Sequence, residues 1–272
     1  AYYFARGFDF AMEGPALDRK VCAKRQTAEV LWQLGQRIKE VYLKTMGERD
    51  AGILSTMVVG DREFLDAETK QLYQIGGLSH ILAISGLHIS VIGMALYRMS
   101  KKAGLPFGMA ALAAAGVMYG YGGMAGWGVS VRRAVLMFLL FLGAQVIGRS
   151  YDTFCALAFA AVALLWKNPC LLWDVGFRFS FVAILGVVWV GQSISYEKKG
   201  MGALRGKIFA ASAVWFTTLP LVAWYFYEIP VYAVFVNLLM LPMMGVLLGF
   251  GVAGGVAGLL SLTLAKGVLL PC

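Results

Sequence analysis

The chain has 272 residues, of which 60% are hydrophobic and only 14% are charged, whereas an ordinary soluble domain carries about 25% charged residues. Its mean hydropathy is +0.72. This composition excludes a disordered chain, a collagen and a coiled coil, and it disfavours a water-soluble globule. A transmembrane helix needs about 20 apolar residues, so the length suffices for several membrane spans.

The formal net charge of +9 is unevenly distributed. Residues 1–77 contain 11 basic and 11 acidic side chains, whereas residues 78–272 contain 13 basic and 4 acidic ones. Cytoplasmic loops of membrane proteins collect Lys and Arg, and an excess of cations also suits an anionic partner. We expect two regions: an extracytoplasmic or interfacial amphipathic region at 1–77, ending a truncated N-terminal domain, and a polytopic membrane domain at 78–272, truncated at its C-terminus.

Three helices are expected before residue 78. In residues 24–46 the apolar positions recur at helical spacing, which predicts an amphipathic helix that either packs on a soluble core or lies in the membrane interface. A second helix is expected at residues 50–59. A third is expected to begin after Asp66, a good N-cap, and to end at the pair Gly76-Gly77.

Seven apolar segments follow, each with the character of a membrane segment: 78–97, 107–119, 131–147, 154–166, 171–190, 208–227 and 231–260. The last is too long for one simple span. Asn237 and Pro242 interrupt it and predict a broken or re-entrant helix surrounded by protein or water. The expected fold is an all-α integral membrane protein, a polytopic helical bundle of about seven membrane segments, some of them broken.

The charges in the connections predict the orientation. Alternate connections carry most of the basic residues, which places those connections in the cytoplasm: Arg98, Lys101 and Lys102, then Arg149, then Lys198, Lys199, Arg205 and Lys207. The first apolar segment then enters from outside. Residues 1–77 are therefore expected on the extracytoplasmic face.

Polar groups inside the first apolar segment are costly in a membrane and therefore informative. His80 and His88 would lie on roughly one face of a continuous helix, and Ser85 would be within reach of His88. Three interpretations compete: a Ser/His nucleophile and base, helix packing through Ser and His hydrogen bonds, and a Ser-Gly break beside a passage. We favour the last two together.

Arginines mark two further positions. Arg132 and Arg133 open the third segment on the side expected to be extracytoplasmic, after an aromatic run that includes Tyr121 and Trp127. They either snorkel to headgroups or form a cationic ring at a pore mouth. In the fifth segment, Asp174 and Arg178 are four residues apart and can pair on one helical face. Mutual neutralisation is the favoured interpretation; if Asp174 instead lies at the interface, Arg178 is left as a cation inside the membrane that needs a counter-charge.

Cysteine and histidine predict no cofactor or metal. The four cysteines show no paired spacing, so neither a disulfide framework nor a zinc site is indicated. The chain begins without Met and stops just after an apolar run, and we expect it to be a piece of a larger protein.

The run at residues 80–88, HILAISGLH, resembles the signature of the ComEC-type competence domain, the inner-membrane DNA uptake channel of naturally transformable bacteria. Further motifs resemble those of the same family in the same order: residues 7–10 (GFDF), 60–62 (GDR), 130–134 (SVRRA), 176–181 (GFRFSF), 218–220 (TLP) and 237–242 (NLLMLP). The resemblance covers nearly the whole chain. Arg178 stands where the family usually has Gln, and Ser90 stands where Gly is common.

The resemblance implies passage of single-stranded DNA across the bacterial cytoplasmic membrane during natural transformation. The implied partners are single-stranded DNA, the lipid bilayer and other competence DNA-uptake proteins. The resemblance leaves open whether the protein forms a homo-oligomer. No catalytic role is expected. The family's metallo-β-lactamase-like domain is not expected in this chain, because its two histidines cannot supply a metal nuclease site.

A translocating strand needs a wet, positive path with aromatic surfaces for its bases. The expected path residues share polar or aromatic side chains: Arg132, Arg133 and Arg178 against phosphates, His80, Ser85, His88 and Asn237 around the lumen and gate, and Tyr121 and Trp127 beside the cations. Gly86, Gly176, Pro220 and Pro242 are expected to be structural. Two alternatives remain, an ion or small-molecule transporter with broken helices and an intramembrane hydrolase using Ser85 and His88.

Overall fold

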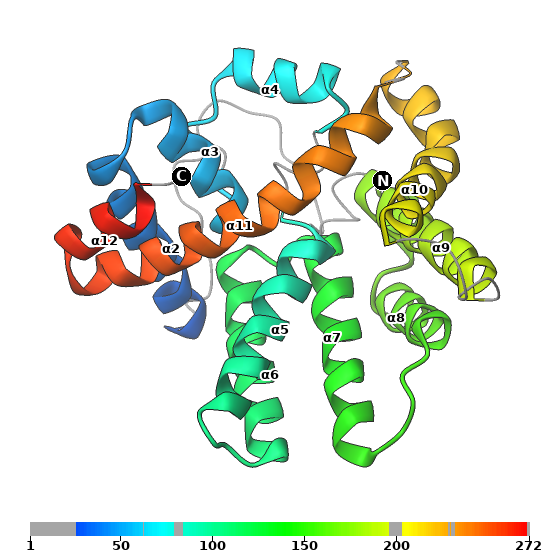
Figure 1. Ribbon diagram of the computed structural model, residues 1–272, viewed down its shortest axis with the longest axis horizontal. Coiled ribbons are helices and arrows are strands. Elements are labelled where there is room, and N and C mark those ends of the chain that lie inside the picture. The colour runs from blue at the N-terminus through cyan, green and yellow to red at the C-terminus, as the bar shows by residue number, and fades with distance from the viewer. Residues whose placement is uncertain are drawn as a thin grey trace.

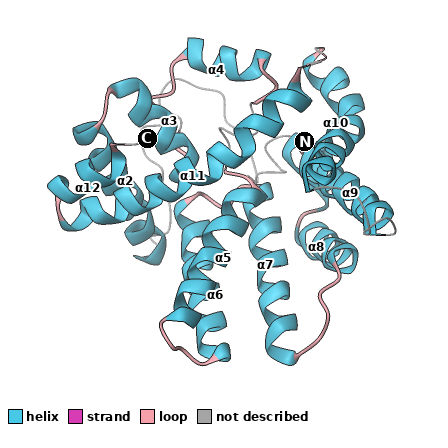
Figure 2. Ribbon diagram, viewed as in Figure 1, coloured by secondary structure: helices cyan, strands magenta, loops and turns pink. Residues whose placement is uncertain are grey.

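The computed structural model describes residues 26–61, 63–78, 84–195, 203–227, 229 and 232–270. In these residues every regular element is a helix and no strand occurs (Figure 2). The predicted all-α class is confirmed for this part of the chain. The helices form three groups, and the long helix α11 (Ala233–Leu260) crosses between them (Figure 1).

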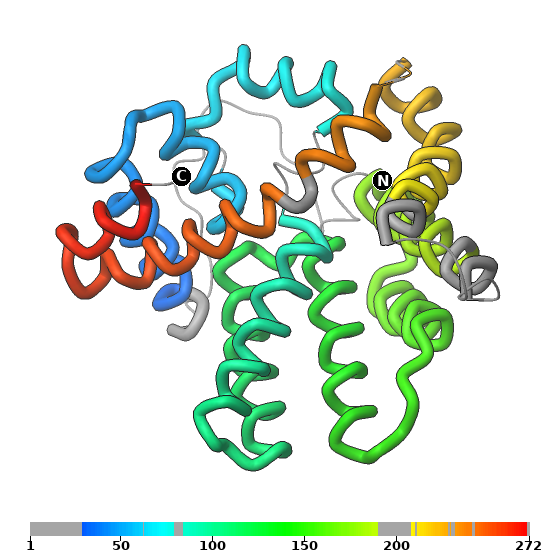
Figure 3. Tube along the Cα trace, viewed as in Figure 1, coloured from blue at the N-terminus to red at the C-terminus, as the bar shows by residue number. Residues whose placement is uncertain are grey.

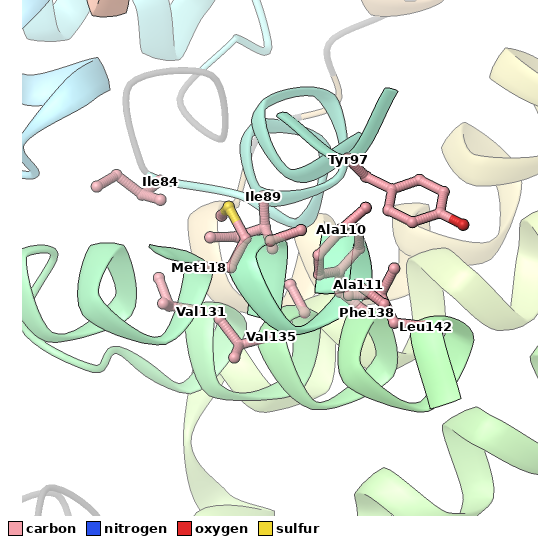
Figure 4. Close-up of a cluster of buried hydrophobic side chains, with 12 residues drawn as sticks. Ile84, Ile89, Tyr97, Ala110, Ala111, Met118, Val131, Val135, Phe138 and Leu142 are labelled. Carbon is pink, nitrogen blue, oxygen red and sulfur yellow. The ribbon is translucent and has the colours of Figure 1, made fainter. Parts of the chain in front are cut away.

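The first group is a bundle of helices α5 (Gly86–Lys102), α6 (Phe107–Met124) and α7 (Val129–Ile147). Alanines give α6 a narrow buried face, and small residues let helices approach closely. A Cβ atom on Gly93 of α5 would lie 2.6 Å from Cζ of Phe138 on α7. Figure 4 shows this core, with Ile84 and Met118 near one end of the bundle and Tyr97 and Leu142 near the other.

The second group packs around the C-terminal half of α11. It contains α2 (Gln26–Thr45), α3 (Glu48–Val58) and α12 (Leu262–Leu269). Glycines of α11 accept the side chains of α2, and the ideal Cβ of Gly258 would be 2.2 Å from Cγ1 of Val41. The predicted amphipathic helix therefore packs within the protein, and its buried face includes Ile38, Val41 and Tyr42, as its periodicity predicts.

The third group contains α8 (Thr153–Lys167), the 3-10 helix η1 (Pro169–Trp173), α9 (Val175–Ser195) and α10 (Ala203–Phe226). Leu157, Phe177 and Phe181 form its core together with Met137 of α7. The prediction of one apolar helix from residue 171 is wrong. Asp174 divides the segment because its Oδ1 accepts a 2.8 Å hydrogen bond from N–H of Phe177 and so caps α9.

The two short N-terminal helices agree with the predictions. Helix α3 ends at Val58, and Gly60 follows with a positive φ of 86°. Helix α4 (Ala67–Ile75) begins after Asp66, whose Oδ2 accepts a 3.3 Å hydrogen bond from N–H of Thr69. Gly77 has a φ of 68°, a conformation that glycine adopts without steric cost.

Two predictions concern helix continuity. The apolar segment 78–97 is interrupted at Ser85-Gly86, as the favoured Ser-Gly break predicts, because Ser85 is extended (φ −108°, ψ 172°) and α5 begins only at Gly86; His80 lies outside the described residues. The predicted break in segment 231–260 is wrong. Helix α11 runs without interruption through Asn237 and Pro242, because helices α2, α3, α5 and α10 pack along it and hold its backbone helical.

Two described helices are long and apolar enough to cross a membrane, as judged by length and composition: Val129–Ile147 and Met243–Leu260. Three further apolar helices are shorter, namely Thr153–Lys167, Val175–Trp189 and Ala211–Phe226. A helix of 15 residues such as α8 is about 22 Å long, less than a hydrocarbon core of about 30 Å. The predicted number of seven spans stays a prediction.

Candidate functional site

The predicted site residues meet at one end of the bundle. Helices α5 and α7 begin there and α6 ends there (Figure 1). This bundle end, as we call it, carries seven of the predicted site residues: Ser85, Gly86, His88, Tyr121, Trp127, Arg132 and Arg133. The sequence separates these residues by up to 48 positions, and the antiparallel course of α6 brings them together.

Ser85 and His88 form a reciprocal helix cap. Oγ of Ser85 accepts a 3.3 Å hydrogen bond from N–H of Leu87 and lies 2.9 Å from Nδ1 of His88, while N–H of Ser85 donates to the same Nδ1 at 3.2 Å. His88 is buried. This pattern is a capping box in which His replaces the usual Glu or Gln. The favoured interpretations, helix packing and an interruption at Ser-Gly, agree with this geometry.

Arg133 lies in the junction between α5, α7 and α9. Its side chain is only 5% exposed. Nε donates a 2.7 Å hydrogen bond to Oγ of Ser180, Nη1 lies 3.6 Å from Sδ of Met137, and the guanidinium lies 5.9 Å from the ring centre of Phe181. Its predicted contact with phosphate stays a prediction, and the present neighbours of Arg133 are neutral groups.

Arg132 and the aromatic residues line the other side of the bundle end. Nε of Arg132 donates a 2.6 Å hydrogen bond to the carbonyl oxygen of Trp127, and its side chain is partly exposed. Trp127 has a φ of 52° and packs against the ring of Tyr119 at 4.8 Å. The hydroxyl of Tyr121 donates to the carbonyl oxygen of Val58, which joins α6 to α3.

The turn at residues 59–61 closes over the same end. An ideal Cβ on Gly60 would lie 3.1 Å from Cδ1 of Ile84 and 3.6 Å from the carbonyl oxygen of Ala125. Asp61 binds Nζ of Lys39 on α2 at 2.7 Å, and Glu63 binds the same Nζ. The turn is therefore tied to α2 as well as to the bundle.

The Lys39 cluster, Lys39 with Asp61 and Glu63, is charged and partly buried. Burial raises the pKa of Asp61, but the hydrogen bonds from Lys39 and from the backbone N–H of Glu63, together with the charge of Lys39, outweigh burial, and the pKa lies below its ordinary value. Burial lowers the pKa of Lys39, but the hydrogen bonds to Asp61 and Glu63 and the attraction of both carboxylates together outweigh burial, and the pKa lies above its ordinary value. Both shifts favour the charged pair at neutral pH.

Arg178 lies at the start of α9 and does not pair with Asp174. Its Nε donates a 2.8 Å hydrogen bond to the carbonyl oxygen of Leu172, and Nη1 donates to the hydroxyl of Tyr225 at 2.8 Å. The predicted neutralisation by Asp174 is wrong, because that carboxylate caps α9 instead. Arg178 also lies 5.1 Å from the ring centre of Trp173, and part of its side chain is exposed.

The remaining predicted residues lie apart from the bundle end. Asn237 is in the second turn of α11, and its Oδ1 is buried without a hydrogen-bond partner among the described residues. Gly176 is in the first turn of α9, and Pro220 lies inside α10. Pro242 lies within α11. The structure thus gathers seven of the predicted residues at the bundle end. Arg178 lies on α9, and another residue of this helix, Ser180, contacts Arg133 at the bundle end.

Sequence reasoning missed two parts of this site. Ser180 was included in a motif but was given no role, although it is the partner of Arg133. Lys39 carries a charge on the predicted amphipathic helix and was given no role, although its side chain is buried. Asp61 in the quoted motif 60–62 was the available signal for Lys39, since a partly buried carboxylate calls for a cation.

The bundle end presents cations, hydroxyl groups and aromatic rings. No group of three or more His, Cys, Asp or Glu side chains that could hold a metal ion occurs in the described part of the chain. Guanidinium groups recognise phosphates and carboxylates, and aromatic faces stack on planar rings. The arrangement is therefore chemically suited to an anionic ligand that also carries planar groups.

Comparison with known protein families shows one match of high coverage. The family model described as "Competence protein" matches residues 57–271. No solved structure matches the chain significantly.

Three curated proteins are similar to the chain over 170 to 214 residues. The chain is 28% identical over 214 residues to ComE operon protein 3 of Bacillus subtilis, covering 79% of this chain and 27% of that protein. It is 28% identical over 200 residues to competence protein ComA of Neisseria gonorrhoeae, covering 70% and 28%. It is 29% identical over 170 residues to recombination protein 2 of Haemophilus influenzae, covering 58% and 21%. The chain thus spans less than a third of the length of these relatives.

Proposed function

This chain belongs to the competence protein family, and from that premise we propose that it forms part of a membrane-embedded path for single-stranded DNA during natural transformation. The observation that carries the proposal is the family match over residues 57–271. The name of one relative refers to competence, and the name of another refers to recombination.

The apolar surface supports a location in the bacterial cytoplasmic membrane with several spans. Large apolar side chains are exposed on α8, α9, α10 and α11, including Phe159, Trp189, Phe216 and Leu239. Water would make such a surface prone to aggregation, whereas lipid makes it favourable. The helices that are shorter than a full span would cross with local thinning of the bilayer or beside other subunits.

The charge of the apolar region supports a polyanionic cargo. All of the net charge of +9 lies after residue 77. Arg132 and Arg178 are partly exposed cations, and Trp127 and Tyr119 form an aromatic pair next to Arg132. The affinity of a protein for a nucleic acid rises with the number of phosphates that its cations neutralise, and bases stack on aromatic rings. Both kinds of group are present at the bundle end.

The rest of the function follows from the family only as a proposal. We expect this segment to act with other competence DNA-uptake proteins, with parts of its own protein outside this segment, and as a channel rather than an enzyme. The small-solute transporter is a weaker alternative. Transporter sites lie at discontinuous helices, and α11 is continuous where a break in the last apolar segment was predicted.

The test uses a transformable bacterium that lacks its own competence-family protein and expresses the full-length protein containing this chain. The readouts are transformant number and labelled single strands that are protected from added nuclease. The double variant Arg132→Gln, Arg178→Gln should reduce both by about tenfold or more. The control Arg98→Gln, Arg149→Gln removes the same charge at the opposite end of the bundle and should retain uptake. Normal uptake in the first variant at normal protein level would refute the assignment.

One observation favours a second candidate, an intramembrane hydrolase. Oγ of Ser85 lies 2.9 Å from Nδ1 of His88, a distance suitable for a nucleophile and its base. The same oxygen, however, accepts a backbone hydrogen bond at the start of α5, which is a complete structural reason for its position. The two functions separate through Ser85 variants that keep the cap and remove the hydroxyl, as described in the Discussion.

A further inference from the structure

Arg133 is a buried cation with no carboxylate partner. Its side chain is 5% exposed, and no ion pair to it occurs among the described residues. Its neighbours are a hydroxyl, a thioether and an aromatic ring. Tyr151 is the titratable group that interacts with it electrostatically, and a phenol is neutral at pH 7. A buried charge is ordinarily compensated by an opposite charge, so the missing partner here points to an anion.

The guanidinium edge that binds oxyanions has one of its two donors in use. Nε and Nη2 lie on one side of the planar group, and this pair of donors matches two oxygens of a phosphate or carboxylate. Ser180 accepts from Nε at 2.7 Å, whereas Nη2 has no hydrogen-bond partner among the described residues. Nη2 is therefore the donor of this edge that is left for a ligand oxygen.

The first turn of α5 adds positive potential at the same point. A Cβ built on Gly86, the first residue of α5, would lie 2.9 Å from Nη2 of Arg133. The N-terminus of a helix carries about half a positive charge. The positive end of the 17-residue α5 therefore lies beside a guanidinium of like sign, an arrangement that an adjacent anion would stabilise.

Ser180 can contribute one more donor. Its Oγ accepts from Arg133, and its own hydroxyl hydrogen has no acceptor among the described residues. A hydroxyl group can donate one hydrogen bond while it accepts another. Ser180 therefore orients the guanidinium and can donate to an oxygen of the same ligand.

We propose that Arg133, Ser180 and the first turn of α5 form a binding site for one phosphate group at the junction of α5, α7 and α9. The proposal deepens the proposed function and rests on it for the source of the ligand, since a DNA strand supplies one phosphate per nucleotide. A lipid headgroup supplies the same chemistry. A Cβ at position 86 would displace the guanidinium edge from its present place.

The test uses the full-length protein purified in a maltoside detergent, which contains no phosphate. Three probes are added at equal ionic strength: inorganic phosphate against chloride, a fluorescent 20-nucleotide dT strand, and phosphatidylglycerol. A ligand that binds the folded protein raises its melting temperature, and anisotropy reports binding of the strand. The test variants are Ser180→Ala and Gly86→Ala. The matched controls are Gly143→Ala, whose Cβ on α7 would meet nothing within 4 Å, and Arg149→Gln.

The proposal expects phosphate to raise the melting temperature of the unsubstituted protein and of both controls. Ser180→Ala and Gly86→Ala should weaken phosphate binding by at least about fivefold, as expected for loss of a hydrogen bond to a charged group. If Gly86→Ala does not fold, Ser180→Ala alone decides. No effect of phosphate on the unsubstituted protein, or a loss below twofold in Ser180→Ala, overturns the proposal.

The three probes separate this site from the proposed function. Weakened binding of the dT strand in the same variants supports both the phosphate site and the proposed function. A site that binds phosphate and phosphatidylglycerol but not the dT strand supports the phosphate site and contradicts its use by DNA. If cells take up DNA through the protein while the variants bind phosphate normally, the proposed function stands and the phosphate site is overturned.

Discussion

The hydroxyl of Tyr42 on α2 donates a 2.8 Å hydrogen bond to the carbonyl oxygen of Gly251 on α11, across 209 positions of sequence. Around this bond, glycines of α11 lie directly against α2, and an ideal Cβ on Gly255 would be 2.8 Å from the same hydroxyl. Helix α2 is thus docked on α11 by one polar contact and by close packing without side chains. The contact connects the region before residue 78 with the last part of the apolar region.

Tyr42→Phe should lower the free energy of unfolding by about 1 kcal/mol, because it removes one buried hydrogen bond and keeps the ring. Gly255→Ala should cost more, about 1–3 kcal/mol, because the added methyl group overlaps with Tyr42 and Ile38. Thermal unfolding of the full-length protein in detergent measures both. Gly245→Ala on the same helix is the control, since its Cβ would meet nothing within 4 Å. Equal stability of the two alanine variants would contradict the docking of α2 on α11.

The Lys39 cluster should make stability dependent on pH at both extremes. The pKa of Asp61 lies below its ordinary 3.8, so its contribution is complete above pH 3.8 and is lost as the pH falls through the folded-state pKa. The pKa of Lys39 lies above its ordinary 10.5, so its contribution is complete below pH 10.5 and is lost as the pH rises through the folded-state pKa. Between these limits the cluster contributes a constant amount.

Lys39→Met should therefore reduce stability by about 1–3 kcal/mol at pH 7, because two carboxylates lose a charged partner. It should also flatten the decline of melting temperature below pH 4. Lys44→Met is the matched control, since Lys44 pairs with Glu40 on the exposed surface of the same helix. An unchanged acid decline in Lys39→Met would show that the stability does not depend on this cluster.

The packing of α5 on α7 gives a sharper prediction. Gly93→Ala should destabilise the bundle by about 1–3 kcal/mol, because its Cβ would lie 2.6 Å from Cζ of Phe138. Phe138→Leu added to Gly93→Ala should recover part of that loss, since the smaller side chain makes room. Gly116→Ala on α6 has open space within 4 Å and should be neutral or slightly stabilising. A double variant no more stable than Gly93→Ala alone would exclude this contact as the cause.

Ser85 separates capping from catalysis. Ser85→Ala removes the N-cap of α5 and should cost about 1 kcal/mol, whereas Ser85→Asn keeps a capping side chain and should cost less. Neither variant has a hydroxyl nucleophile. If the protein is a DNA channel, transformation at normal protein level should remain close to normal in Ser85→Asn. Complete loss of function in both variants despite normal folding would instead favour the hydrolase.

The sequence allowed local structure to be predicted far better than contacts between segments. Hydrophobic runs located the apolar helices, and the capping residues Asp66 and Gly76 located α4, because these signals lie within a few residues of the element they define. Ser85 shows two local signals in competition. Its apolar surroundings favour a helix, but its side chain hydrogen-bonds the backbone of the first turn, so α5 begins only at the next residue, Gly86, where the Ser-Gly break was predicted.

Long-range partners could not be predicted from periodicity. The pair Asp174 and Arg178 has ideal helical spacing, yet Asp174 lies before the helix and Arg178 contacts Tyr225, 47 positions away. Ser180 meets Arg133 across the same separation. Such contacts depend on how α7, α9 and α10 are arranged in space, and no single segment contains that information. The sequence predicted that these polar residues share a function, but it did not predict that they lie together at the bundle end.

The first and last described helices, α2 and α12, lie side by side, the blue and red ends of the tube in Figure 3. Their common partner is the second half of α11, so Tyr42 meets Gly251 only after 209 further positions have been synthesised. At bacterial rates of about 5–20 residues per second, this takes about 10–40 s. During that interval α3 and α6 can already cover part of the apolar side of α2, but the part around Tyr42 that packs on α11 stays exposed and open to association between nascent chains.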